Sequence, residues 1–421
     1  MATMIISSPP PAEDAMSASK VLGDEDLLGE ILRRVDSPTS LVRAALVSKR
    51  WLRTASGRDL VRCFCALHPP CRHLLGFYVT GDCVPRPEFV SMPALEPHDR
   101  ELSAVLRQAS NSVFEAFPEY SSRVWDSRDG RVLFDFTETV HGTRRFGVRH
   151  PDRGVSELPP MPSDWPDPEP QCPEAMLLPD DGNDDATCYR LRYRYSGPKV
   201  TALVGVLRSG VWTVHCAAEA VLAMAPDRIP LLTRLASGKL YMVAVAGYIL
   251  GLDMATSSFF VIDFPEGVAY EYYGNLVPCR GDGSVLYLIH LMGDRLCVWL
   301  RRIVDEHGAG EWVLRDTISL NETCGHLVES GMLEPAAGHT AVATVAGVGD
   351  NAEFVFLELF GDGGVFVHMH LSSRKVERVY QRDPYNDEIT EVYPCSMVWL
   401  PLFPAIDEGE GGQLHQEEAS T

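Results

Sequence analysis

The chain has 421 residues, 45% of them hydrophobic, and is therefore long enough to build two or three domains with cores of their own. Its formal net charge of −21 would repel the phosphates of nucleic acid, and no basic patch with interleaved aromatic residues offsets it, which argues against nucleic acid as a partner. No apolar run reaches the roughly 18 residues that cross a bilayer, and no signal peptide is evident, so we expect no membrane contact and a cytoplasmic or nuclear location.

Residues 1–19 are expected to form a disordered tail, and the first predicted element is a helix that begins after Asp24. A short carboxylate at this position can accept hydrogen bonds from the free amides of the opening turn. Apolar residues then recur at helical spacing and give the helix one broad apolar stripe. They are Leu27, Leu28, Ile31, Leu32 and Val35.

Two further short helices are predicted within a helical domain over residues 20–60. Ser37 followed by Pro38 is a start signal, because a capping side chain precedes a residue whose fixed φ suits the first turn. A third helix carries Val47 and Trp51 and is expected to end near Gly57. Three helices in so short a segment bury too little surface to fold well alone. A partner or the rest of the chain must cover the excess apolar surface.

Residues 22–51 read L-G-D-E-D-L-L-G-E-I-L-R-R-V-D-S-P-T-S-L-V-R-A-A-L-V-S-K-R-W. This order of caps, charges and apolar residues resembles an F-box, whose pattern runs L-P-x-E-L-L-x-E-I-L-x-R-L, then S-L-x-R-A and V-C-K-x-W. Gly23 replaces the usual proline and is expected to loosen the approach to the first helix, while Ser48 replaces the usual cysteine. The alternative is an ordinary helical hairpin packed on the next domain.

The resemblance implies that this segment docks on a Skp-family adaptor, which in turn joins a cullin scaffold. It also implies which side chains face the adaptor, although some of them must instead hold the three helices together. These adaptor-binding candidates are Leu22, Leu27, Leu28, Ile31, Leu32, Val47 and Trp51.

Residues 61–73 are expected to be a linker that contains five possible metal ligands. These are Cys63, Cys65, His68, Cys71 and His73. Their spacing fits no common zinc finger, so we interpret the cysteines as small hydrophobic residues. The eleven cysteines of the whole chain are scattered and odd in number, which predicts reduced thiols rather than a disulfide framework.

Alternating apolar and polar residues replace the helical pattern from residue 74 to residue 405. Short runs of β-forming residues begin directly after Gly-containing turns, which supply the positive φ that hairpins need. The turns are Asp129-Gly130, Ser209-Gly210, Ser237-Gly238, Asp282-Gly283 and Gly363-Gly364. Several intervals between them are about 40 residues or twice that, which is the period of a propeller blade.

We therefore predict a mainly β fold with a small N-terminal α domain, in which a three-helix F-box precedes a closed β-propeller of about six to eight short-stranded blades. The β region is similar to the degenerate kelch-like propellers that follow the F-box in many plant proteins, especially those of grasses. It has no strict double-Gly kelch signature and no Trp-Asp repeat. We expect strands at residues 74–79 and 397–402 to lie side by side and close the ring, because closure leaves no exposed edge strand.

No catalytic motif stands out in the chain. It contains no G-x-S-x-G elbow, H-E-x-x-H helix, G-x4-G-K-[ST] loop or dinucleotide fingerprint. His368 and His370 lie two apart on a predicted strand and so on one face, but no third metal ligand accompanies them. We therefore predict no catalytic residue, no metal and no cofactor. Residues 406–421 are acidic and are expected to form a disordered tail.

Together with the F-box resemblance, these features predict a non-catalytic substrate-receptor subunit of an SCF-type ubiquitin ligase, acting in protein degradation. The β domain would bind a target protein that the sequence does not identify. Two alternatives remain at this point. One is a β-propeller enzyme or carbohydrate-binding protein with a helical interaction hairpin, and the other is an F-box adaptor that acts outside ubiquitination.

Overall fold

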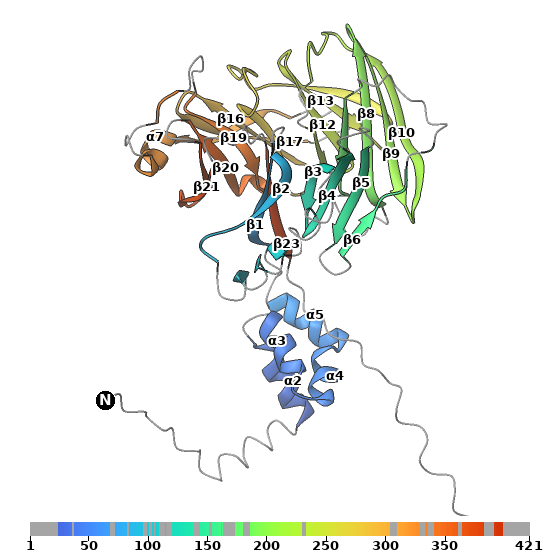
Figure 1. The fold of residues 1–421 in the computed structure, drawn as a ribbon, viewed down its shortest axis with the longest axis vertical. Helices are drawn as coiled ribbons and strands as arrows, with labels where there is room; N and C mark the ends of the chain where they lie inside the picture. Colours follow the sequence, from blue (N-terminus) through green and yellow to red (C-terminus); the bar gives the residue numbers. More distant parts are fainter. Residues whose placement is uncertain are drawn as a thin grey trace, which may run out of the picture. The chain divides into compact units, whose positions relative to one another are not determined.

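The chain divides into two compact units in the computed structural model (Figure 1). One comprises residues 1–73 and 397–421, and the other residues 74–396. The structure describes residues 24–35, 38–67, 72–81, 84–95, 99–100, 103–104, 106–108, 114, 120–138, 144–150, 154–160, 162, 173–179, 186–229, 233–303, 310–328, 333–335, 341–360, 364–382 and 391–398. Helices make up most of the described part of the first unit, and β-sheets make up most of the second.

The helices of the first unit begin where capping side chains allow. They are α2 (Glu25–Arg33), α3 (Pro38–Ala45), α4 (Lys49–Ala55) and α5 (Arg58–Leu67). Oδ1 of Asp24 accepts hydrogen bonds from the backbone N–H groups of Asp26 at 2.9 Å and Leu27 at 3.2 Å, so the predicted cap is confirmed. Gly23 and Ser37, which we singled out at two predicted helix starts, lie outside the described residues.

Ser48 caps α4, the third helix. Its hydroxyl accepts a hydrogen bond from the backbone N–H of Trp51 at 3.2 Å. The residue that replaces the usual F-box cysteine therefore has a local structural role, because it satisfies one of the open amides at the helix start. The helix ends at Ala55, slightly before the glycine at position 57 that we expected to end it.

A fourth helix, α5, completes the core of the helical unit. We expected a linker from residue 61 onward, and the structure places residues 61–67 in α5. Leu60 and Phe64 stand one turn apart on α5 and are both buried. They cover apolar surface that three helices alone would leave open, which explains why this segment is helical. The resulting cluster contains Leu28, Leu32, Leu41, Ala45, Ala55, Leu60 and Phe64.

Six sheets form the blades of a β-propeller, in agreement with the predicted fold class (Figure 1). Five of them are four-stranded and built from consecutive antiparallel strands. The first contains β3 (Tyr120–Arg128), β4 (Arg131–Glu138), β5 (Arg144–His150) and β6 (Gly154–Glu157). The second contains β7 (Glu174–Leu177), β8 (Ala186–Ser196), β9 (Lys199–Arg208) and β10 (Val211–Val221). The third contains β11 (Thr233–Ala236), β12 (Lys239–Ala244), β13 (Tyr248–Asp253) and β14 (Ser258–Asp263).

The fourth and fifth blades follow the same plan. The fourth contains β15 (Leu276–Arg280), β16 (Val285–Met292), β17 (Arg295–Arg302) and β18 (Trp312–Ser319). The fifth contains β19 (Ala343–Val348), β20 (Phe354–Leu359), β21 (Val365–His370) and β22 (Val376–Gln381). Short helical segments lie in their connections, namely α7 (Leu320–Cys324), η1 (Gly325–Leu327) and η2 (Asp350–Ala352).

The sixth blade joins the two ends of the β region. It contains β1 (Arg72–Gly81), β2 (Val84–Ser91) and β23 (Glu391–Val398), in the order β2-β1-β23. The first strand thus pairs with the last, which confirms the predicted closure of the ring. The last strand begins earlier than the expected span of residues 397–402, and residues 399–402 lie outside the described part of the chain.

The hairpin turns have the backbone that their glycines predicted. Asp129 and Gly130, between β3 and β4, have φ angles of 49° and 73°. Ser209 and Gly210, between β9 and β10, have φ angles of 49° and 78°. Two consecutive residues with positive φ match the right-handed twist of the strands they join, which is why these pairs set the hairpin register.

The hydrophobic cores lie between neighbouring blades. One apolar cluster joins the second and third blades and includes Leu191 of β8 and Leu240 of β12, both fully buried. Another joins the fourth and fifth blades and includes Ile289 of β16 and Leu357 of β20. Packing of each sheet on the next holds the innermost strands, β3, β7, β11, β15, β19 and β23, around a common axis.

Candidate functional site

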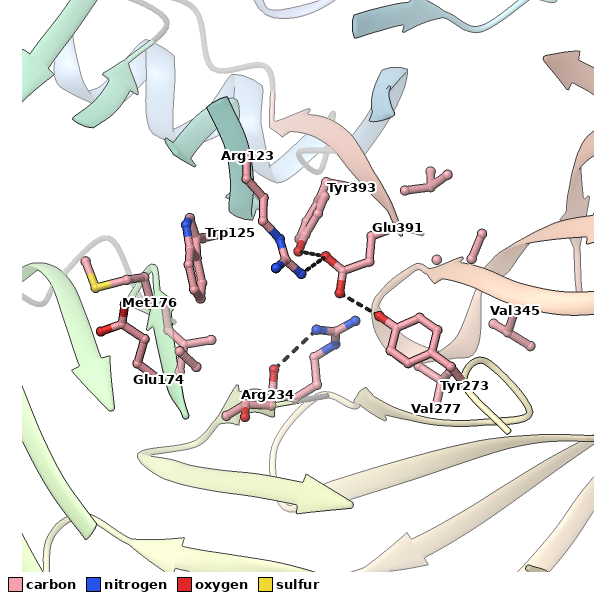
Figure 2. Close-up of a pocket in the computed structure, with 16 residues that line it drawn as sticks. Arg123, Trp125, Glu174, Met176, Arg234, Tyr273, Val277, Val345, Glu391 and Tyr393 are labelled. Atoms are coloured by element: carbon pink, nitrogen blue, oxygen red, sulfur yellow. Dashed lines mark hydrogen bonds and ion pairs between the residues drawn. The ribbon is translucent and has the colours of Figure 1, made fainter. Parts of the chain in front are cut away.

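The innermost strands of all six blades line one cavity, which we call the axial channel (Figure 2). Its volume of about 40 Å³ is room for a few water molecules or one small polar group, and is far below that of a drug-sized ligand. The lining combines charged, aromatic and small apolar side chains. Its polar members are Arg123, Trp125, Glu174, Thr233, Arg234, Tyr273, Glu391 and Tyr393.

Glu391 of β23 is the centre of one polar network in the channel (Figure 2). Its Oε1 accepts a hydrogen bond of 2.5 Å from the Tyr273 hydroxyl, and its Oε2 accepts one from the Tyr393 hydroxyl. Nη2 of Arg123, on β3, lies 3.2 Å from the same Oε2. The pair thus links the closing blade to the first blade, at a separation of 268 positions in the sequence.

This network keeps its members in defined protonation states. Burial would lower the pKa of Arg123, but the charge of Glu391 outweighs it, and the pKa of the guanidinium is raised overall. Burial, followed by the charge of Glu391, raises the pKa of both Tyr273 and Tyr393. Both phenols therefore stay protonated near neutral pH and act as hydrogen-bond donors.

Glu174, at the start of β7, is the centre of a second network. Its Oε2 accepts hydrogen bonds from Nε and Nη2 of Arg190 at 3.0 and 2.6 Å, and Nε of Arg192 lies 3.9 Å from it. Nη1 of Arg144 donates to Oε1 at 2.8 Å, while Nε of Arg144 lies 2.9 Å from Asp135. Burial raises the pKa of Asp135 despite the nearby Arg144. Three guanidinium groups thus share two carboxylates.

Arg234 has no such carboxylate among the residues that the structure describes. Within the described part of the chain, its guanidinium makes one hydrogen bond, of 3.2 Å to the backbone carbonyl of Thr233, and no ion pair. The hydroxyl of Thr233 is buried, with the residue only 3% exposed, and it has no hydrogen-bond partner among the described residues. The channel therefore contains donor groups that no described acceptor satisfies.

The structure separates the predicted adaptor-binding residues into two groups. Leu27 and Ile31 are 47% and 41% exposed on α2, and Val47 is 67% exposed after α3. Leu28 and Leu32 are fully buried in the helical core. Trp51 is half-buried and packs against the same core, and Leu22 lies outside the described residues.

Sequence reasoning missed residues in both regions. Leu46, beside Val47, is 64% exposed and was not included among the adaptor-binding candidates, although its place in a short turn was a signal of exposure. Arg123, Arg234 and Glu391 were missed because each comes from a different blade and no local motif connects them. The signal in the sequence that could have indicated them was a charged side chain near the start of a short apolar strand in each case.

The possible metal ligands do not converge within the described chain. No group of three or more His, Cys, Asp or Glu side chains in the described ranges could hold a metal ion. Cys63 and Cys65 lie on α5, while His68 and Cys71 are outside the described residues. Burial lowers the pKa of His368 to about 4, and its half-buried ring lies 5.1 Å from that of Phe354.

Comparison with known families identifies the β region. A family model described as "F-box protein AT5G49610-like, beta-propeller" matches residues 123–403, which is more than half of the chain. The chain belongs to this family. The match runs from β3 of this F-box propeller to beyond β23, so it includes the innermost strands that line the axial channel. The helical unit precedes the matched range, and its F-box assignment rests on the sequence pattern.

No curated protein matches this F-box propeller. Among solved structures, it is similar to the uncharacterized protein lmo1340 from Listeria monocytogenes EGD-e, with 11% identity, coverage of 65% of this chain and 84% of that one, and a TM-score of 0.32. Sqt1 of Saccharomyces cerevisiae has 7% identity, coverage of 62% and 60%, and a TM-score of 0.28. Prolyl oligopeptidase B from Galerina marginata has 10% identity, coverage of 75% and 48%, and a TM-score of 0.30. None of the helices in the described residues is long and apolar enough to cross a bilayer.

Proposed function

We propose that this protein is a non-catalytic substrate receptor of an SCF-type ubiquitin ligase, located in the cytoplasm, the nucleus or both. Its helical unit would bind a Skp-family adaptor, and through it a cullin, while the propeller would bind the target protein. The observation that carries the proposal is an F-box-like segment with large apolar side chains exposed on it, placed before a propeller of an F-box protein family. Such exposed apolar groups on a small unit are typical of a docking surface.

The exposed side chains are the better candidates for adaptor contact. Leu27 and Ile31 are one turn apart and therefore share a face of α2, and Val47 is the third exposed member of the predicted set. Leu28 and Leu32 have no surface left to offer, so we assign them to the core of the helical unit. Trp51 packs on that core and would contribute to docking through its exposed part or by supporting α4.

The proposed role requires no bond chemistry from this chain. A receptor accelerates ubiquitin transfer by holding its target near a charged enzyme, which raises the effective concentration of the reacting groups. The acidic groups of the axial channel are paired with arginines and its phenols are protonated, which suits binding better than proton abstraction. No cofactor is needed for this role.

Capture of a Skp-family adaptor by the full chain tests the proposal. Leu27→Asp together with Ile31→Asp should reduce capture at least tenfold, because buried apolar anchors at an interface often contribute about 2 kcal/mol each. The matched control is Val221→Asp, an apolar-to-acidic change at a residue of β10 that is 74% exposed. It should leave capture unchanged, and both proteins should keep the thermal stability of the wild type.

Adaptor capture that survives the double substitution would show that the F-box assignment is wrong. A wild-type chain that captures no adaptor would favour a propeller enzyme or carbohydrate-binding protein with a helical interaction hairpin. Capture of the adaptor without cullin association, or without ubiquitin transfer to a bound protein, would favour an F-box adaptor that acts outside ubiquitination.

A further inference from the structure

We propose that the axial channel is a subsite for a carboxylate, and that the propeller recognises a target segment through an aspartate or glutamate side chain placed beside Arg234. The inference rests on the proposed receptor function and specifies the class of target that the receptor takes. The group that carries it is the guanidinium of Arg234, whose single hydrogen bond in the described structure goes to a backbone carbonyl.

The charges around the channel favour an anion. In the first network one arginine, Arg123, faces one carboxylate, that of Glu391. In the second network, three arginines face the two carboxylates of Glu174 and Asp135. Arg234 adds another cation. The lining itself contains two arginines, Arg123 and Arg234, and two glutamates, Glu174 and Glu391, so the excess of positive charge among the described residues comes from the arginines that contact Glu174 without lining the channel. This local excess stands in a chain whose formal net charge is −21, so an anion that meets repulsion elsewhere would be attracted here.

Unused hydrogen-bond donors supply the specificity. A guanidinium has five N–H donors arranged as a planar fork that matches a carboxylate, and Arg234 uses one of them. Thr233 lines the same channel, and its hydroxyl is buried and has no partner among the described residues. A buried polar group without a partner lowers stability unless a ligand or water satisfies it. Two independent side chains, one charged and one neutral, therefore indicate an oxygen-bearing ligand at the same place.

The size of the channel restricts that ligand to a small group. Its volume of about 40 Å³ corresponds to about three water molecules, so a carboxylate can enter by displacing water, whereas a sugar ring or nucleotide cannot. Two residues that line the channel also contact solvent, since the Arg123 side chain is 29% exposed and Tyr273 is 37% exposed. An acidic side chain on an extended target segment has the reach to enter from this open part, while the rest of the segment would contact the surface around it.

Selection from a random peptide display library on the purified full chain tests the proposal. We expect the selected peptides to be enriched in aspartate or glutamate. For such a peptide, Arg234→Gln should weaken binding at least tenfold, measured by fluorescence anisotropy, and Arg234→Lys should restore part of it by returning the charge without the planar fork. Arg295→Gln, which removes an exposed arginine from β17, is the matched control and should bind like the wild type.

Thr233→Val provides a second variant whose effect separates a ligand contact from a structural role. Since the Thr233 hydroxyl has no described partner, the substitution should leave the thermal midpoint unchanged or raise it, yet weaken peptide binding. Thr233→Ser should bind like the wild type because it keeps the hydroxyl. A Thr233→Val protein that loses stability but keeps its affinity would show that the hydroxyl has a structural role only, and would overturn this part of the proposal.

Three results would overturn the recognition of an acidic target side chain in the channel. They are a selected peptide pool without acidic enrichment, an Arg234→Gln protein that binds acidic peptides as tightly as the wild type, and stabilisation by sodium acetate, relative to sodium chloride of equal ionic strength, without binding of any acidic peptide. The last outcome would assign the channel to a free small carboxylate. Failure here is distinguishable from failure of the receptor function, because Arg234→Gln should leave adaptor capture unchanged and the Leu27→Asp, Ile31→Asp protein should still bind the peptide.

Discussion

The ion pair between Arg123 and Glu391 should contribute strongly to the stability of the closed ring. Glu391→Ala removes the acceptor of three donors at once, namely the Arg123 guanidinium and the hydroxyls of Tyr273 and Tyr393. Breaking a buried ion pair by deleting one partner costs about 3–5 kcal/mol. The side chains of Arg123 and Glu391 are 29% and 12% exposed, so solvent screens part of this cost. We therefore expect the free energy of unfolding to fall by about 3 kcal/mol.

Urea unfolding followed by tryptophan fluorescence measures this change. Trp125, one of the seven tryptophans of the chain, lies in the same channel, with its ring 5.4 Å from the Arg123 guanidinium, and contributes to this signal. A second substitution sharpens the test. In the Glu391→Ala background, Arg123→Met removes the cation that has lost its partner and should recover at least about 1 kcal/mol. The reasoning is refuted if Glu391→Ala lowers the free energy by less than about 1 kcal/mol, or if adding Arg123→Met destabilises the protein further.

Three other predictions concern packing and protonation. Leu28→Ala should lower the free energy of unfolding of the helical unit, measured in urea, by about 2–5 kcal/mol. Leu27, one residue away, is 47% exposed, so Leu27→Ala should change this free energy by less than about 0.5 kcal/mol. Equal effects would contradict the division into core and exposed residues. Gly251→Ala places a Cβ atom 2.1 Å from the ring of Phe260, so the thermal midpoint of this variant should drop. Adding Phe260→Ala removes the clash and should restore part of the loss. An unchanged midpoint in Gly251→Ala would show that the ring moves aside freely and would contradict the prediction. Burial lowers the pKa of His368 to about 4 from 6.5, so unfolding takes up a proton between these pH values. The free energy of unfolding should therefore fall on acidification through this range by up to about 1.4 kcal/mol per pH unit. His368→Gln should flatten this pH profile, and an unaltered slope would contradict the lowered pKa of His368.

Local features of the fold could be predicted from the sequence because each depends on neighbours in the chain. The cap at Asp24 needs only a short carboxylate ahead of free amides, and the turn at Asp129 and Gly130 needs only two residues that tolerate positive φ. The fourth helix of the first unit was missed for the opposite reason. Leu60 and Phe64 are buried because they cover a core built by other helices, and the F-box-like pattern, which ends at Trp51, does not express that requirement.

The sequence by itself therefore determined the fold class and the order of the two units. Caps, helical periodicity and the F-box-like order of residues marked the N-terminal unit, while Gly-containing turns at a period near that of a blade marked a closed propeller, whose first and last strands pair. These signals are repeated along the chain, so no long-range contact is needed to detect them.

Only the tertiary structure decided which residues are available for binding. Leu27 and Leu28 are the same amino acid, yet Leu27 is exposed and Leu28 is buried. The rotation of α2 against its neighbouring helices sets which of its faces is covered. The axial channel likewise exists only in the closed ring, where six strands from distant parts of the chain each bring a side chain to one axis. Arg234 has no described carboxylate partner because the acidic groups at that axis already pair with arginines from other blades. Such a balance of charge depends on distances in space, which the order of residues along the chain does not express.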